Sequence, residues 1–139
     1  MIEIDGSKGE GGGQIIRTAI ALSAVTGTPV RITNIRVNRP NPGLSHQHLR
    51  GAEFLAKITD AEVQGLKLGS KELFFAPRRI KGGDFDVDIK TAGSISLFLQ
   101  SLIPAALYAS DRLRVRVRGG TDVKWSPPID FLRFILVPA

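Results

Sequence analysis

The chain has 139 residues, 42% of them hydrophobic, contains no cysteine and carries a formal net charge of +6 at pH 7. This is the size of one ordinary domain with a buried core, and the lack of cysteine excludes disulfides and cysteine-ligated zinc or iron–sulfur sites. The positive charge suits a polyanionic partner and is also an ordinary means of staying soluble. The longest apolar stretch, residues 95–108, is too short to cross a bilayer, and residues 1–5 show no signal peptide. We therefore expect a cytoplasmic protein without a membrane partner.

The first half of the chain alternates between predicted strands and helices. Residues 2–5 alternate apolar and polar side chains, as a half-buried strand does, and the glycines at 11–13 lead from that strand into a helix. The next elements are predicted from their periodicity and turn residues: a strand over 30–35, a helix over about 44–59, and strands over 62–64 and 72–76. The predicted order is strand, helix, strand, helix, strand, strand.

The same order restarts in the second half at a constant offset of 83 positions. The corresponding pairs are Ile2 and Phe85, Ile4 and Val87, Val30 and Leu113, Ile32 and Val115, and Leu44 and Pro127. An internal repeat explains this offset economically. We predict an α+β fold of repeated βαβαββ units, with a first unit over 1–80 and an incomplete second unit over 81–139. The second unit would need two further strands after a helix that begins near Pro127.

The run from Glu10 to Arg17, with three consecutive glycines, indicates phosphate chemistry. Glycines let a ligand approach the backbone amides, and the free N–H groups at a helix start favour an anion. The run fits neither the dinucleotide-binding nor the P-loop pattern, and a flexible strand-to-helix turn is the alternative interpretation.

Two rows of charge lie on predicted strands in the second half. The basic row is Arg112, Arg114, Arg116 and Arg118, and the acidic row is Asp84, Asp86 and Asp88. The arginines could follow an RNA backbone or form the solvated face of a sheet. The aspartates could offset the arginines if the two strands pair, and their spacing fits that role better than a metal site.

Several motifs in order resemble the RNA 3'-terminal phosphate cyclases. They occupy residues 10–18, 36–44, 47–49, 91–100, 119–122 and 127–128. The resemblance runs across nearly the whole chain and implies repeated units, each with two helices on one face of a four-stranded sheet. Members of this family are longer, so we expect the chain to be their N-terminal portion, with a small inserted domain and the C-terminal catalytic part absent.

The resemblance implies a ligase-type, ATP-dependent reaction in RNA processing that converts an RNA 3'-phosphate into a 2',3'-cyclic phosphate. An enzyme histidine takes AMP from ATP, AMP passes to the RNA 3'-phosphate, and the 2'-hydroxyl displaces it. The implied cofactors are ATP and Mg²⁺ or Mn²⁺, and the implied partner is an RNA 3'-phosphate end. The nucleophilic histidine is expected beyond Ala139, so residues 1–139 alone are expected to be inactive. The missing C-terminal part and a second copy of the chain are the candidate protein partners.

The resemblance also implies site residues, one position at a time. Those implied to bind ATP are Gln100, Pro127, Pro128 and Glu10, with Glu10 also implied to hold the metal. Those implied to bind RNA or phosphate are Arg17, Arg36, Arg39, Gln47 and His48. The structural alternatives are a favourable charge before a helix for Glu10, a solvated side chain for the arginines and for His48, a core hydrogen bond to backbone for Gln100, and proline at a helix start for Pro127 and Pro128. Gln100 also stands out by itself, because an unpaired amide on an apolar helix is costly and is expected to have a specific partner.

The two histidines and Trp125 have no catalytic role in this interpretation. His46 and His48 are both expected to titrate near neutrality, and neither matches the nucleophile. Trp125 has no assigned role.

The alternative function is that of a noncatalytic relative of the cyclases that binds RNA or protein in ribosomal RNA processing. Enolpyruvyl transferases, with similar units, are a more distant alternative. The combination of Glu10, Arg17 and Gln100 favours the cyclase, because a binding protein does not need a nucleotide site.

Overall fold

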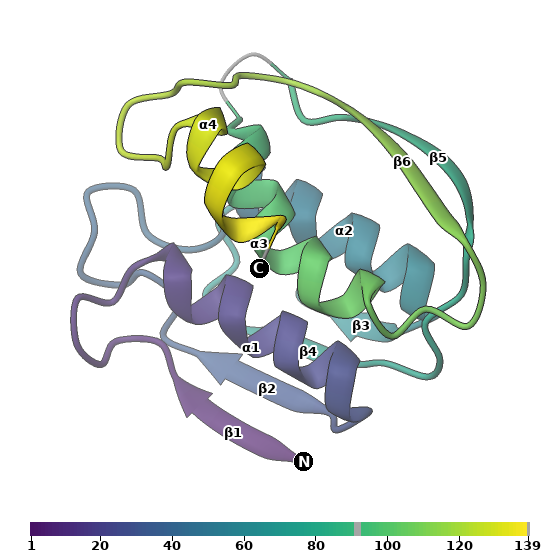
Figure 1. The fold of residues 1–139 in the computed structure, drawn as a ribbon. Coiled ribbons are helices and arrows are strands. Elements are labelled where there is room, and N and C mark those ends of the chain that lie inside the picture. Colours follow the sequence, from purple (N-terminus) through teal and green to yellow (C-terminus); the bar gives the residue numbers. More distant parts are fainter. Residues whose placement is uncertain (91–92, 139) are drawn as a thin grey trace.

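The computed structural model describes residues 1–90 and 93–138, so Thr91 and Ala92 of the 91–100 motif, and Ala139, lie outside the described residues. The elements in chain order are β1 (Ile2–Asp5), α1 (Gly13–Thr26), β2 (Val30–Thr33), α2 (His46–Thr59), β3 (Glu62–Gln64), β4 (Leu73–Ala76), β5 (Gly83–Asp88), α3 (Ile95–Ala106), β6 (Leu113–Arg118), α4 (Ile129–Phe131) and a π-helical turn, η1 (Leu132–Leu136) (Figure 1). The fold is α+β, as predicted.

The first sheet has four strands in the order β1-β2-β4-β3. Strands β1 and β2 are parallel, with Ile2 opposite Val30 and Asp5 opposite Thr33, whereas β4 is antiparallel to both β2 and β3. Because β1 and β2 run in the same direction and end at the same level, the loops that follow them leave the same edge of the sheet. This edge carries the candidate site.

Three helices lie between the four-stranded sheet and a separate two-stranded parallel ribbon of β5 and β6 (Figure 1). Phe54 of α2 joins the layers: its ring lies 5.5 Å from that of Phe85 on β5, edge to face, and 5.6 Å from that of Phe98 on α3. Buried apolar residues of α1, α2, α3 and the first sheet form one core with these aromatic rings. No helix in the described part of the chain is long and apolar enough to cross a membrane.

The element boundaries differ from the predicted ones where local backbone chemistry intervenes. Strand β2 ends at Thr33, two residues early, because Asn34 has a φ of 52° and leaves the extended region. Helix α2 begins at His46 instead of 44, because Ser45 serves as its N-cap and forms a capping box with His48. The helix predicted near Pro127 begins at Ile129, after Pro128 at the N-cap, and is short.

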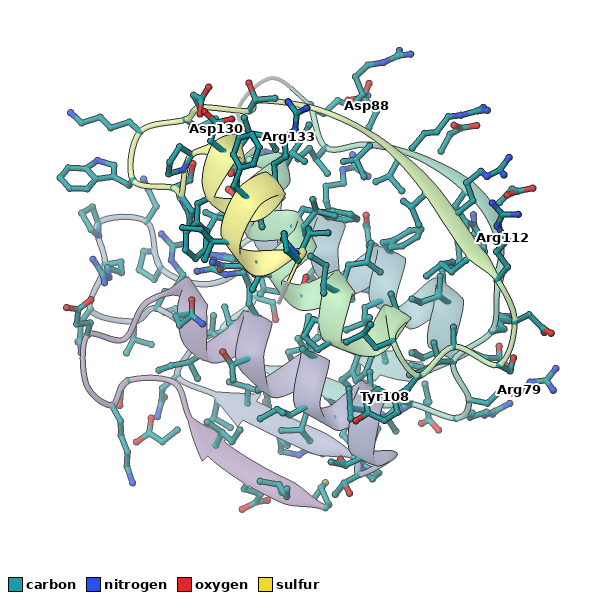
Figure 2. The ribbon with its side chains drawn as sticks, in the orientation of Figure 1. Arg79, Asp88, Tyr108, Arg112, Asp130 and Arg133 are labelled. Carbon is teal, nitrogen blue, oxygen red and sulfur yellow. The ribbon has the colours of Figure 1, made fainter. Side chains whose placement is uncertain are left out.

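The acidic and basic rows pair across the β5–β6 ribbon. Asp84, Asp86 and Asp88 lie opposite Arg114, Arg116 and Arg118. The nearest charged atoms are 3.8 Å apart in the first pair and 3.9 Å in the second. Figure 2 shows Asp88 and Arg112 on the outer side of the ribbon, away from the helices. The predicted offset of the arginines by the aspartates is therefore confirmed for Arg114 and Arg116, and the four exposed arginines exceed the three aspartates by one positive charge.

Candidate functional site

The loops that follow β1 and β2 enclose the N-terminus of α1. At their base, the Gly6 amide donates to the carbonyl of Thr33 at 2.7 Å. At their far end, a Cβ atom on Gly12 would lie 3.1 Å from Nη2 of Arg39. The glycines therefore let an arginine of the second loop come close to the amides at the helix start, which is the environment that an anion prefers.

His48 reaches the same place from α2. Its imidazole lies against Gly13, the first residue of α1, in the space that any side chain at position 13 would occupy. Nδ1 of His48 accepts from the Ser45 amide at 3.3 Å and lies 2.9 Å from Ser45 Oγ. Because Nδ1 is an acceptor, the neutral ring carries its proton on Nε2, on the side that faces the start of α1.

The surroundings of His48 keep it neutral. Burial, followed by the positive charges of Arg36 and Arg17, lowers the pKa of His48 to about 4. The expectation that this residue titrates near neutrality is therefore wrong, because the sequence does not reveal the burial or the two nearby guanidinium groups. His46, at the first position of α2, is exposed. At pH 7 His48 is a neutral N–H donor.

Arg17 is partly buried beside His48. Burial lowers the pKa of Arg17, but a guanidinium remains charged in proteins. Nη2 donates to Oε1 of Gln14 at 2.9 Å, whereas Nε is buried and has no hydrogen-bond partner among the described residues. A buried donor without a partner is costly, so a ligand that brings an acceptor to Nε would remove a penalty.

Arg36 and Arg39 bring two more positive charges to the second loop. Arg36 has a φ of 50°, and its Nη1 donates to the carbonyl of Gly43 at 2.8 Å. Burial and the neighbouring charge of Arg39 both lower the pKa of Arg36. Since like charges held close together destabilise one another, a bound anion would relieve this repulsion. The structure thus places Arg36 and Arg17 beside His48, and Arg39 beside Arg36 and Gly12.

Gln47 lies next to this cluster, at the inner side of α2. Its Nε2 atom is buried and has no partner among the described residues. A cavity of about 10 Å³ lies between α1, α2 and α3 and is lined in part by Gln47, Arg17 and His48. This volume is at the lower limit for one water molecule, so the cavity is too small for a phosphate group.

Glu10 lies exposed on the loop before α1. The described residues contain no group of three or more histidine, cysteine, aspartate or glutamate side chains that could hold a metal ion. Proteins usually bind Mg²⁺ through one or two carboxylates together with phosphate oxygens of the substrate, and Glu10 could supply one such carboxylate. Any metal at Glu10 would therefore depend on a phosphorylated ligand.

The three residues implied for the nucleotide lie on other elements. Gln100 is on α3, and its Oε1 atom is buried without a hydrogen-bond partner, so the expected partner is not among the described residues. Pro127 is half-buried and Pro128 is exposed at the N-cap of α4. Asp122 fixes that turn, because its Oδ1 accepts from the Ile129 amide at 3.2 Å.

Two residues that form hydrogen bonds at the site were not identified from the sequence. Ser45 holds the ring of His48, and Asp5 accepts hydrogen bonds from both loops. The spacing Ser-x-x-His before an apolar helical pattern is close to that of a capping box, and Asp-Gly-Ser is typical of a turn closed by the aspartate. Both signals were present in the sequence.

Comparison with known proteins identifies the family. The family model described as RNA 3'-terminal phosphate cyclase matches residues 8–139. A protein of that name from Methanosarcina acetivorans is 60% identical over 139 residues, which make up 100% of this chain and 39% of the relative. One from Ignicoccus hospitalis is 62% identical over 138 residues, 99% of this chain and 39% of the relative. One from Pyrococcus furiosus is 59% identical over 132 residues, 95% of this chain and 39% of the relative.

The chain spans about two fifths of the length of the curated relatives that it matches. The names of these relatives indicate the same family as the motifs at residues 10–18, 36–44 and 91–100. Since the family model covers nearly every residue, the chain belongs to the RNA 3'-terminal phosphate cyclase family.

Proposed function

We propose that this chain forms the phosphate-binding part of an ATP-dependent enzyme that converts an RNA 3'-phosphate into a 2',3'-cyclic phosphate. The observation that carries the proposal is the convergence of three arginines and a neutral histidine on the N-terminus of α1. A terminal phosphate carries up to two negative charges and several acceptor oxygens, which matches guanidinium forks, an imidazole N–H and free helix amides.

In this proposal, Arg36 and Arg39 offset the charge of the RNA 3'-phosphate, and Nε2 of His48 donates to one of its oxygens. Arg17 adds a third positive charge beside this phosphate, and Gln47 lies next to it on α2. Because none of these groups has to move a proton at pH 7, their work is positioning and charge stabilisation, which phosphoryl transfer chiefly requires.

For the nucleotide we propose Gln100, Pro127 and Pro128. The unpaired, buried Oε1 of Gln100 is an acceptor that suits the exocyclic amino group of adenine. The proline rings offer flat apolar surface for a base. Glu10 would hold Mg²⁺ or Mn²⁺ together with phosphate oxygens, and the ion would there reduce the negative charge of the triphosphate.

The proposed reaction has three displacements. A histidine outside residues 1–139 attacks the α-phosphorus of ATP and releases pyrophosphate; an oxygen of the RNA 3'-phosphate then takes AMP from the histidine. The 2'-hydroxyl finally attacks the 3'-phosphorus, loses its proton and releases AMP, which closes the cyclic phosphate. In all three steps the developing charge lies on phosphate oxygens, where the arginines act.

We further infer that residues 1–80 and 81–139 are a complete and a partial copy of one unit. Asp5 and Asp88 lie 83 positions apart, and each accepts the amide of the residue two positions later, at 3.0 and 2.8 Å. The prediction of a constant offset of 83 is wrong at the second strand of each copy: Ile4 pairs with Ile32 and Val87 with Val117, so Ile32 matches Val117, at an offset of 85, and not Val115. Two additional residues between β5 and β6 account for this change.

The test is an assay of the full-length gene product with ATP and an RNA oligonucleotide that ends in a 3'-phosphate. Cyclisation makes the terminal phosphate resistant to phosphatase, and an oligonucleotide with a 3'-hydroxyl is the control. We expect Arg39→Gln to weaken the reaction and Arg79→Gln, at an exposed arginine after β4 (Figure 2), to leave it unchanged. RNA binding without consumption of ATP would instead favour the noncatalytic alternative.

A further inference from the structure

Asp5 occupies the point where the two loops of the site begin. It is the last residue of β1 and lies opposite Thr33, the last residue of β2. The first loop, residues 6–12, carries Glu10 into α1, and the second loop, residues 34–45, carries Arg36 and Arg39. The distance between these charged groups therefore depends on how the two loops are joined at the base.

A single oxygen of Asp5 joins them. Oδ1 accepts the Ser7 amide at 3.0 Å and the Ser7 hydroxyl at 2.7 Å, both from the first loop. The same atom accepts Nδ2 of Asn34 at 3.1 Å, from the second loop. The bonds from Ser7, followed by that from Asn34, lower the pKa of Asp5, so its carboxylate is ionised at neutral pH.

The backbone around this connection is tightly constrained. A Cβ atom on Gly6 would lie 2.8 Å from the Thr33 carbonyl oxygen, so the loops touch at their base. Asn34 and Arg36 have φ values of 52° and 50°, and such conformations in residues other than glycine persist only where the surroundings hold them. The bond from Asn34 to Asp5 is one contact that does so.

We propose that Asp5 is a positioning residue that sets the separation of the two phosphate-binding loops, through Oδ1 and without contact with substrate. This inference rests on the proposed function, because it assigns Asp5 to the same site. It has a specific chemical consequence: all three donors meet Oδ1, which asparagine also possesses. The role needs an acceptor atom and not a negative charge.

The experiment compares Asp5→Asn with Asp5→Ala in the full-length gene product. One readout is the affinity for inorganic phosphate, and the other is the KM and kcat of cyclisation. We expect Asp5→Ala to weaken phosphate binding and raise the KM for RNA about tenfold or more, because small displacements of binding groups have large effects. Asp5→Asn should remain within about threefold of wild type, since it keeps the acceptor.

Two further variants act as controls. Asp84→Ala removes an exposed carboxylate from the start of β5, where its partner is Arg114, and should change neither readout. Asn34→Gly keeps the positive φ accessible but removes the side-chain amide. It should therefore weaken phosphate binding and raise the KM for RNA, but by less than Asp5→Ala does. Melting temperatures show whether a variant has lost its fold.

Several outcomes would overturn the inference. If folded Asp5→Ala binds phosphate and RNA as wild type does, Asp5 does not position the loops. If Asp5→Asn loses as much as Asp5→Ala, the charge is required, as for a metal ligand, and the acceptor role is wrong. If Asp5→Ala binds phosphate more weakly than wild type and Asp5→Asn does not, but wild type forms no cyclic phosphate, the proposed function fails while the inference on Asp5 stands.

Discussion

Gly13 and His48 are in direct contact across the α1–α2 interface, since a Cβ atom at position 13 would overlap the imidazole. Gly13 is the first residue of α1, at a helical position where alanine is normally favoured by up to about 1 kcal/mol. Gly13→Ala should therefore displace His48 without weakening the helix. We expect the KM for RNA 3'-phosphate to rise about tenfold or more, measured in the full-length gene product.

The matched control for this substitution is Gly51→Ala. Gly51 lies inside α2, and an added Cβ would be 3.5 Å from Oγ of Ser101, an ordinary van der Waals distance. Alanine there should stabilise the chain by about 0.5–1 kcal/mol in urea unfolding and leave the KM unchanged. If Gly13→Ala behaves in the same way, the contact of His48 with the start of α1 has no part in binding RNA.

The low pKa of His48 predicts a pH-dependent loss of stability. In the unfolded chain the histidine takes a proton near pH 6.5, whereas in the folded chain it does so only near pH 4. Between these values the unfolded state binds more protons, so stability falls as the pH falls, by up to about 3 kcal/mol, and the penalty is absent above pH 6.5. Urea unfolding of wild type and of His48→Gln, each at pH 6.5 and near pH 4, measures this loss of stability.

His46→Gln is the control, because His46 is exposed on the same turn of α2. The stability difference between wild type and His48→Gln should change with pH in this range, and by more than that between wild type and His46→Gln. A proton NMR titration assigns the groups directly. A midpoint near 6.5 for the ring of His48 would show that its imidazole is solvated, contrary to the structure.

The parts of the fold that were predictable from the sequence depend on local periodicity. The pairing of aspartates with arginines across β5 and β6, the Asp–Arg ladder, was predictable because charged and apolar residues alternate along both strands. Pairing of the two strands then puts both charged rows on one face. The glycine run before α1 was likewise readable as a helix entry. In both cases the residues that decide the outcome are close together in the chain.

The arrangement of the site depends on contacts that periodicity does not encode. Arg17 and Arg39 are 22 positions apart, and they approach because β1 and β2 end at one sheet edge. Family resemblance, and not spacing, suggested that they act together. The positive φ of Asn34 and the burial of His48 are tertiary effects as well, so the early end of β2 and the low pKa could not be read from the local sequence.

The ion pairs of the ladder should contribute little to stability individually. Asp86 and Arg116 are both largely exposed, and water and salt screen such pairs, so Asp86→Ala should change the unfolding free energy by less than about 1 kcal/mol. Asp86→Arg instead puts a positive charge directly opposite Arg116 and should destabilise the ribbon at low salt. Thermal unfolding at low and high salt checks this: the deficit of Asp86→Arg should shrink as salt rises. A deficit that is independent of salt would indicate lost packing instead of repulsion.

Phe54 should be among the most sensitive positions of the core, because it connects α2 with both α3 and the β5–β6 ribbon. It is 6% exposed and contacts the rings of Phe85 and Phe98. Phe54→Ala leaves a cavity between the helices and the ribbon and should cost about 3–5 kcal/mol in urea unfolding. Phe134→Ala, at a side chain that is 64% exposed, is the control and should cost less than about 1 kcal/mol.

Similar losses of stability in Phe54→Ala and Phe134→Ala would mean that the β5–β6 ribbon does not share a core with the helices. In that case the ribbon could open while α1, α2 and the first sheet stayed folded, and amide exchange in β5 would be faster than in β2.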